Sequence, residues 1–186
     1  MKTIRAGVVG PGSIGINHAR IYSELEGCEL TAIYDANRAS AEKAAAKYGG
    51  KVCATLEEFA SLVDVASVAT NTESHHEIGT HLLGQGKHLL IEKPIAVNVE
   101  EAKCMLQAAR TAARVLYVGM THRFYPELRE AKRLIDDGAI GTPVAGSAFF
   151  GCPGHERWHP APGFYYLRGG GPMLRVHTGS GDIHID

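Results

Sequence analysis

Short apolar runs alternate along the chain with segments whose apolar residues recur at helical spacing. The runs have the length and composition of strands that are buried on both faces. The expected strands are residues 4–9, 29–35, 51–54, 64–70, 87–94 and 114–120. The expected helices between them are residues 13–25, 39–49, 56–62, 74–86 and 98–112. These repeated units predict an α/β fold over residues 1–120, a Rossmann-type doubly wound parallel sheet with helices on both faces.

The pattern changes after residue 120. Residues 126–141 have the spacing of an amphipathic helix with proline in its first turn, and residues 143–151 have strand composition. Beyond residue 151 no clean period is visible. A single strand would leave its edge hydrogen bonds exposed. Residues 121–186 are therefore expected to be the start of an incomplete α+β second domain.

Composition narrows the function classes. The chain is 45% hydrophobic and 21% charged with a formal net charge of −1, as is ordinary for soluble globular proteins. It has no basic stripe, so nucleic acid is not expected as a partner. No apolar run approaches the ~18 residues of a membrane span, and no signal peptide is recognisable. Four separated cysteines without a C-x-x-C pair predict free thiols and a cytoplasmic location.

The segment GPGSIG follows the first expected strand and opens the first expected helix, which is the context of a dinucleotide-binding loop. Gly10 would permit the tight turn, Gly12 would let the backbone approach a pyrophosphate, and Gly15 would let the helix pack closely on the strand. The backbone amides of Ser13 and Ile14 would face the phosphates at the positive end of the helix. The alternative is a glycine turn without a ligand.

An acidic residue stands where such folds bind the adenosine ribose. Asp35 ends the second expected strand, about 20 residues beyond the loop, and its carboxylate would accept hydrogen bonds from a ribose diol. It would repel a 2′-phosphate, so NAD is favoured as the cofactor. Arg38 could instead meet a 2′-phosphate, which keeps NADP as the alternative.

The segment HLLIEKPIAV places Glu92, Lys93 and Pro94 at the carboxyl end of a strand, the edge at which doubly wound sheets bind ligands. A lysine there can transfer a proton or hydrogen-bond a substrate hydroxyl. Spacing alone equally permits a surface Glu–Lys pair before a turn.

Three segments together resemble the Gfo/Idh/MocA oxidoreductases: GVVGPGSIGINHARIY, ATNTESHHEIGTHLLGQGKHLLIEKPIAV and RFYPELREAKRLIDDGAIG. The resemblance implies that residues 1–120 bind the dinucleotide and that residues 121–186 are part of a substrate and oligomerisation domain. It implies hydride transfer between NAD(P) and a hydroxyl carbon of a sugar, cyclitol or related small molecule. Full-length members of the family usually form homo-oligomers, which leaves the state of this chain open.

The resemblance also implies roles for single residues in the cofactor site. Lys93 is expected to be the active-site lysine, and the Lys93–Pro94 peptide is expected to be cis. Thr70, Asn71 and His75 match the segment that lines the nicotinamide side of the cofactor, although Asn71 replaces a common proline.

On the substrate side, Arg123 matches an R-F segment that approaches cofactor and substrate, with His122 as its neighbour. The run RWHPAPGFYY resembles a subgroup of the family in which aromatic residues face the substrate, because aromatic faces suit sugar rings. The aromatic and histidine residues concerned are Trp158, His159, Tyr165 and Tyr166. The alternative is that these four side chains take part only in ordinary packing.

Other polar residues have simpler interpretations. His18 is expected to be a packing or surface residue, and His81 is expected to face solvent. The spacing of Cys152, His155 and His159 is not a standard zinc pattern, so no metal site is expected.

The family's second motif, G-G-G-x-x-x-D-x-G-x-H, begins at residues 169–171, where its active-site helix would start, and then loses register. Without gaps, Arg175 falls at the aspartate and His177 at the glycine. If the motif is shifted along the chain, Asp182 and His184 can stand for its aspartate and histidine, but the spacing between them differs from that of the motif. His177 and His184 are the candidate catalytic partners of the E-K-P lysine.

Family chains are nearly twice as long, so a frame change or premature stop near Leu174 is one hypothesis for the lost pattern. Three functions stay open at this stage. The first is a dehydrogenase of the family, and the second is a truncated module that binds NAD(P) without turnover. The third is an enzyme that oxidises its substrate transiently, as some family glycosidases do.

Overall fold

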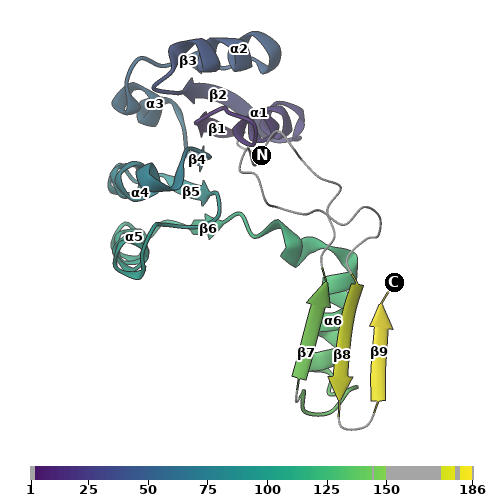
Figure 1. Ribbon diagram of the computed structural model, residues 1–186. Coiled ribbons are helices and arrows are strands. Elements are labelled where there is room, and N and C mark those ends of the chain that lie inside the picture. The colour runs from purple at the N-terminus through teal and green to yellow at the C-terminus, as the bar shows by residue number, and fades with distance from the viewer. Residues whose placement is uncertain (1–2, 144, 150–172, 179–180, 186) are drawn as a thin grey trace, which may run out of the picture. The chain divides into compact units, whose positions relative to one another are not determined.

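The computed structural model describes residues 3–143, 145–149, 173–178 and 181–185 (Figure 1). The chain forms two compact units, residues 1–120 and residues 121–186.

The first unit is built on a six-stranded sheet with the order β3-β2-β1-β4-β5-β6, in which every neighbouring pair is parallel. Its strands are β1 (Ile4–Val9), β2 (Cys28–Tyr34), β3 (Lys51–Val52), β4 (Val65–Val68), β5 (His88–Ile91) and β6 (Leu116–Val118). This is the strand order of the doubly wound dinucleotide-binding fold. The predicted sheet is confirmed, and the strand order reverses between β1 and β4.

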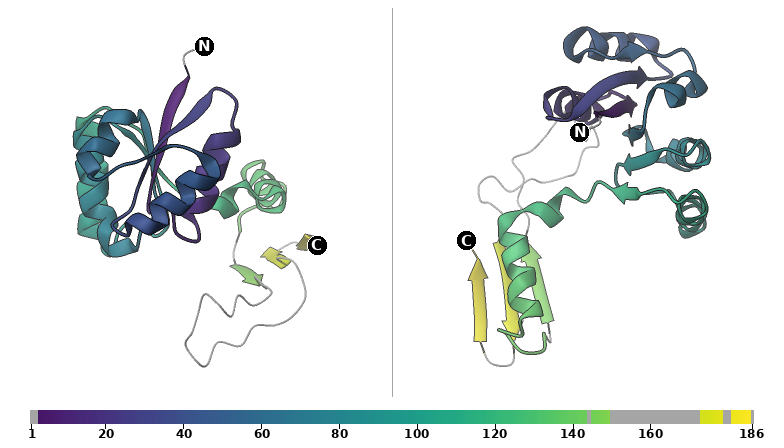
Figure 2. Two further views of the ribbon diagram at one scale, coloured as in Figure 1. Left: turned by 90° about the horizontal axis from the view of Figure 1, so that it is seen from above. Right: turned by 180° about the vertical axis from the view of Figure 1, so that it is seen from behind.

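Helices cover both faces of this sheet and bury two separate cores. In Figure 1, α4 and α5 lie to one side of the strands and α1 lies to the other, and the rear view in Figure 2 agrees. One core packs α1 and α2 against the sheet, and the other packs α3, α4 and α5 against the opposite face. The helices are α1 (Gly15–Glu24), α2 (Arg38–Tyr48), α3 (Leu56–Leu62), α4 (His75–Gly84) and α5 (Val99–Thr111).

Side-chain caps set where two of these helices begin. Thr55 precedes α3 and its hydroxyl accepts a hydrogen bond of 3.1 Å from the backbone N–H of Glu58. Asn98 precedes α5 and its side chain accepts one of 2.8 Å from the N–H of Glu101. Each cap satisfies an amide that the first helical turn leaves without an intrahelical acceptor.

The second unit consists of a short 3-10 helix η2 (Thr121–Phe124), helix α6 (Pro126–Asp136) and a three-stranded antiparallel sheet. Its strands, in spatial order, are β7 (Ala145–Phe149), β8 (Met173–Thr178) and β9 (Gly181–Ile185). The expectation of a single strand is therefore wrong. So is the expectation of a helix after residue 171, because residues 173–178 form β8.

The sequence of β8 and β9 explains this difference. Leu174 to His177 of β8 alternate apolar and polar residues, and so does GDIHI of β9, which is the period of a strand and not of a helix. The hairpin pairs Arg175 with His184 and His177 with Asp182. The two candidate catalytic histidines thus lie on adjacent strands of one hairpin.

Three cysteines, Cys28, Cys53 and Cys104, are free thiols as predicted, and Cys152 lies outside the described residues. None of the helices in the described part of the chain has the length and apolarity that a membrane span requires.

Phe59 of α3 is the largest fully buried side chain of the first unit. It packs so closely on β1 that a Cβ on Gly7 would lie 2.6 Å from its ring. We expect Phe59→Ala to lower the free energy of unfolding by about 3–5 kcal/mol, because it removes apolar burial and leaves a cavity. Urea unfolding followed by circular dichroism measures this. Leu106→Ala on the 44% exposed side chain of α5 is the matched control, with an expected change below about 1 kcal/mol.

Candidate dinucleotide-binding site

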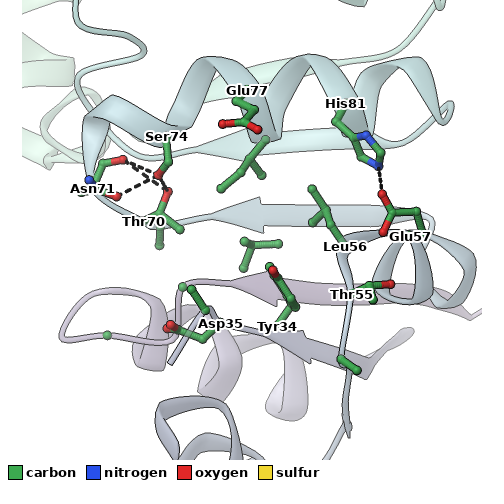
Figure 3. A pocket seen from close by; sticks show the side chains of 17 residues that line it. Tyr34, Asp35, Thr55, Leu56, Glu57, Thr70, Asn71, Ser74, Glu77 and His81 are labelled. Carbon is green, nitrogen blue, oxygen red and sulfur yellow. Dashed lines mark hydrogen bonds and ion pairs between the residues drawn. The ribbon is translucent and has the colours of Figure 1, made fainter. Parts of the chain in front are cut away.

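A cavity of about 740 Å³ lies at the carboxyl edge of the first unit's sheet (Figure 3). Its walls come from the ends of β1, β2 and β4, the connection from β3 to α3, and helix α4. This is the crevice beside the reversal of strand order, where such sheets bind ligands. Five predicted cofactor residues line it, namely Gly10, Gly12, Asp35, Thr70 and Asn71.

The glycine loop has the geometry that its sequence predicts. Gly10 has a φ of +81°, and a Cβ there would lie 2.9 Å from the backbone nitrogen of Thr70. A Cβ on Gly15 would lie 2.1 Å from the carbonyl oxygen of Gly10, so only glycine lets α1 approach β1 this closely. A Cβ on Gly12 would meet no atom within 4 Å, so the space in front of that residue is open for a ligand.

Helix α1 begins at Gly15, two residues after the predicted start, so Ser13 and Ile14 belong to the turn that leads into it. No acidic residue stands in its first turn. The positive end of the helix dipole is therefore available to an anion beside Gly12.

Asp35 and Arg38 are placed differently with respect to the cavity. Asp35 lines it, and one carboxylate oxygen accepts a 2.8 Å hydrogen bond from the backbone N–H of Asn37. Arg38 is not among the lining residues, and its Nε lies 2.8 Å from Glu42 of the same helix. The carboxylate faces the ligand space while the guanidinium is held on the exposed surface of α2.

Two more carboxylates, Glu57 and Glu77, line the cavity, and its described lining contains no lysine or arginine. Hydrogen bonds from its own backbone N–H and from the Thr55 hydroxyl lower the pKa of Glu57, which favours the charged form. His81 lies 3.7 Å from Glu57 and completes this end of the cavity, so the expectation that it faces solvent is wrong.

Helix α4 contributes cavity residues that sequence reasoning missed. Ser74, which precedes α4, lies with Glu77 and His81 of α4 on one side of the cavity, opposite Tyr34 and Asp35 (Figure 3). Ile78 of α4 also lines the cavity. These four residues are spaced three, four and seven residues apart, as on one helical face. This spacing is the signal that could have found them.

The start of α4 is tied to the end of β4 by a cluster of short contacts. The Ser74 hydroxyl oxygen lies 2.9 Å from the hydroxyl oxygen of Thr70 and 2.8 Å from the side-chain oxygen of Asn71. The substitution of Asn71 for a common proline therefore adds a polar anchor at the cavity wall.

His75 is 1% exposed and is not among the lining residues. Its Nδ1 lies 2.9 Å from the carbonyl oxygen of Pro94, and its Nε2 lies 3.2 Å from that of Thr70. The ring therefore connects the chain after β4 to the chain after β5. The peptide bond between Lys93 and Pro94, just before the carbonyl that His75 contacts, is cis, as predicted.

The E-K-P segment follows β5, outside the described lining of the cavity. The side chain of Lys93 is exposed and forms no hydrogen bond or ion pair with the described residues. Glu92 is largely buried, with 14% of its side chain exposed, and lies 3.1 Å from His18. The expectation that His18 is only a packing or surface residue is wrong, because both of its ring nitrogens have polar partners.

The substrate-side residues fall in the second unit. His122 and Arg123 lie in η2, and His177 and His184 lie in β8 and β9. The aromatic segment that contains Trp158, His159, Tyr165 and Tyr166 lies outside the described residues.

Comparison with known proteins agrees with this geometry. A family model described as an oxidoreductase family with an NAD-binding Rossmann fold matches residues 4–120. Inositol 2-dehydrogenase of Rhizobium meliloti is 34% identical over 75% of this chain and 42% of its own length. Glucose-6-phosphate 3-dehydrogenase of Bacillus subtilis is 32% identical over 76% of this chain and 40% of its own length.

Among solved structures, scyllo-inositol dehydrogenase from Lactobacillus casei with bound NAD(H) and scyllo-inositol superposes with a TM-score of 0.74 at 26% identity. The match covers 79% of this chain and 45% of that one. The chain spans about two fifths of the length of the curated relatives that it matches. The chain therefore belongs to the Gfo/Idh/MocA oxidoreductase family, and residues 4–120 form its NAD-binding Rossmann fold.

Proposed function

We propose that this chain binds NAD in the cavity at its strand ends and serves an NAD-dependent oxidoreductase. The reaction would move a hydride between NAD and a hydroxyl carbon of a sugar, cyclitol or related small molecule. The observation that carries the proposal is the open space in front of Gly12, which continues into an acidic cavity beside the ribose carboxylate Asp35.

The residues present fit this cofactor. The pyrophosphate would lie against the backbone at Gly12 and the amides of Ser13 and Ile14, at the positive end of α1. The ribose hydroxyls would donate hydrogen bonds to Asp35. Asp35 would repel the 2′-phosphate of NADP, and the charges of Glu57 and Glu77 in the same cavity would add to this repulsion, so NAD is the proposed cofactor.

Bound nicotinamide supplies the hydride acceptor, and the chain has to supply proton transfer and positioning. Lys93 is the proposed acid/base group, because its exposed side chain is free of competing partners in the described chain. In oxidation its Nζ would take the proton of the substrate hydroxyl, and in reduction it would return that proton to the carbonyl oxygen. His177 and His184 are its proposed partners in the second unit.

The proposed substrate class is a ring that carries secondary hydroxyl groups. Relatives named for dehydrogenation of inositol and of glucose 6-phosphate support this choice. His122, Arg123 and the four aromatic-segment residues named above are the proposed substrate contacts.

Replacing Gly12 tests the pyrophosphate site. Gly12→Ala should leave the melting temperature unchanged, since its Cβ meets no atom, but should weaken NADH binding about tenfold or more by occupying the ligand's space. NADH fluorescence titration and thermal unfolding measure the two effects. Gly84→Ala, in which the added Cβ also meets no atom, is the control: it should leave NADH affinity unchanged and raise the melting temperature slightly, because it lies in the last turn of α4. Unchanged NADH affinity in Gly12→Ala would show that the cofactor does not approach this loop.

The preference for NADH over NADPH tests the proposed role of the Asp35 carboxylate beside the adenosine ribose. The wild-type chain should bind NADH at least about tenfold more tightly than NADPH, and Asp35→Ser should narrow this ratio by weakening NADH and relieving repulsion of the phosphate. Glu42→Gln is the companion variant, because it frees Arg38 without altering the cavity lining, and it should improve NADPH binding only. Equal affinities for both cofactors in the wild type would contradict the proposed NAD preference.

The reaction itself is tested at Lys93. With inositols, glucose 6-phosphate and related ring polyols as substrates, Lys93→Met should lower NAD reduction about 100-fold or more while NADH affinity stays within about twofold. Absorbance at the NADH band follows turnover. Lys103→Met on α5 is the control. NADH binding by the wild type without turnover on any of these substrates would instead support a binding module.

A further inference from the structure

A line of four polar side chains runs beneath the E-K-P segment, and the proposed reaction does not use it. Tyr22 and His18, four residues apart, lie on one face of α1. The Tyr22 hydroxyl lies 2.7 Å from that of Ser67 on β4, which is 0% exposed. The Ser67 hydroxyl lies 2.9 Å from Nδ1 of His18, and Nε2 of His18 lies 3.1 Å from Oε1 of Glu92.

The chemistry of these groups assigns a direction to the hydrogen bonds. An ionised carboxylate only accepts, so Nε2–H of His18 donates to Glu92. A neutral imidazole then presents Nδ1 as an acceptor, to which the Ser67 hydroxyl donates its hydrogen bond. The Ser67 oxygen accepts in turn from Tyr22. Burial raises the pKa of Tyr22, which favours the protonated hydroxyl that this order requires.

The line ends at the backbone of the proposed catalytic residue. Oε2 of Glu92 lies 3.2 Å from the backbone nitrogen of Lys93 and accepts its N–H. The residue after β6 also lies close to Glu92, because a Cβ on Gly119 would lie 3.0 Å from Oε1 and 3.4 Å from Oε2. One oxygen of this closely packed carboxylate therefore accepts from His18, and the other accepts from the amide of Lys93.

We propose that His18 is a positioning residue for Lys93. It donates to Glu92 and so keeps the carboxylate in the place where it orders the E-K-P backbone. The inference rests on the proposed function only for its catalytic consequence. The helix that follows the pyrophosphate loop would then also set the position of the acid/base lysine.

The alternative is that His18 only fills a polar gap in the core. A buried carboxylate that loses its donor is expected to turn toward water, because an unpaired buried charge is costly. His18→Leu should therefore free Glu92 and expose the Lys93 amide. His18→Gln can still place an N–H near the carboxylate and should restore the arrangement.

Amide hydrogen exchange measured by NMR on the 186-residue chain tests this without turnover. The Lys93 amide should exchange about tenfold faster in His18→Leu and close to the wild-type rate in His18→Gln. Tyr22→Phe is the control, because it removes the far end of the line and keeps the contact between His18 and Glu92. Amides of the central strand β1 serve as the internal reference for global stability.

Gly119→Ala gives an independent route if His18→Leu does not fold. Its Cβ would press on both carboxylate oxygens of Glu92, at 3.0 and 3.4 Å, and shift that side chain, so the Lys93 amide should again exchange faster. Where the wild type turns over, His18→Leu should lower kcat about tenfold or more with substrate KM within about twofold. A wild type without turnover would overturn the proposed reaction and leave the exchange result to decide the role of His18. Unchanged Lys93 exchange in both His18→Leu and Gly119→Ala, or failure of His18→Gln to restore it, would overturn the positioning role.

Discussion

Helix α1 can seat itself against the end of β1 only because residue 15 has no side chain. A Cβ there would overlap the carbonyl of Gly10, at 2.1 Å, and no rotamer change can relieve a clash with backbone. This contact sets the turn at Gly10 and Gly12 and aims the start of the helix at the cavity. The ligand space at the strand ends therefore depends on one close approach between two backbone segments.

The same contact has a consequence one to two turns further along α1. Because the start of the helix is held against β1, His18 and Tyr22 come to lie over β4 and reach Ser67. From there the polar line continues to Glu92 after β5. The loop that would hold phosphate and the segment that carries Lys93 are thus joined through one rigid helix.

The local patterns explain why much of this unit could be predicted. Buried strands are short apolar runs, and β1 and α3 match their predicted ranges, while α5 begins one residue after its predicted start. Strands β4 and β5 are shorter than predicted, since the residues after them turn away to form the site. The hairpin of β8 and β9 was missed because the G-G-G resemblance implied a helix, whereas the alternation of the residues favours strands.

Residue identity and spacing were enough to indicate the fold class, the glycine loop, the carboxylate of Asp35 after β2 and the E-K-P segment. Each of these is a local signal within one strand–turn–helix unit. The fold alone revealed the contacts of His18 and His75. The Ser67 and Glu92 partners of His18 are 49 and 74 residues away in the chain, and the Pro94 partner of His75 is 19 residues away, so only the packing of α1 and α4 on the sheet brings them within hydrogen-bonding distance. Such long-range polar contacts leave no periodic pattern in a sequence. In the folded chain they are required, because a buried polar side chain needs a hydrogen-bond partner.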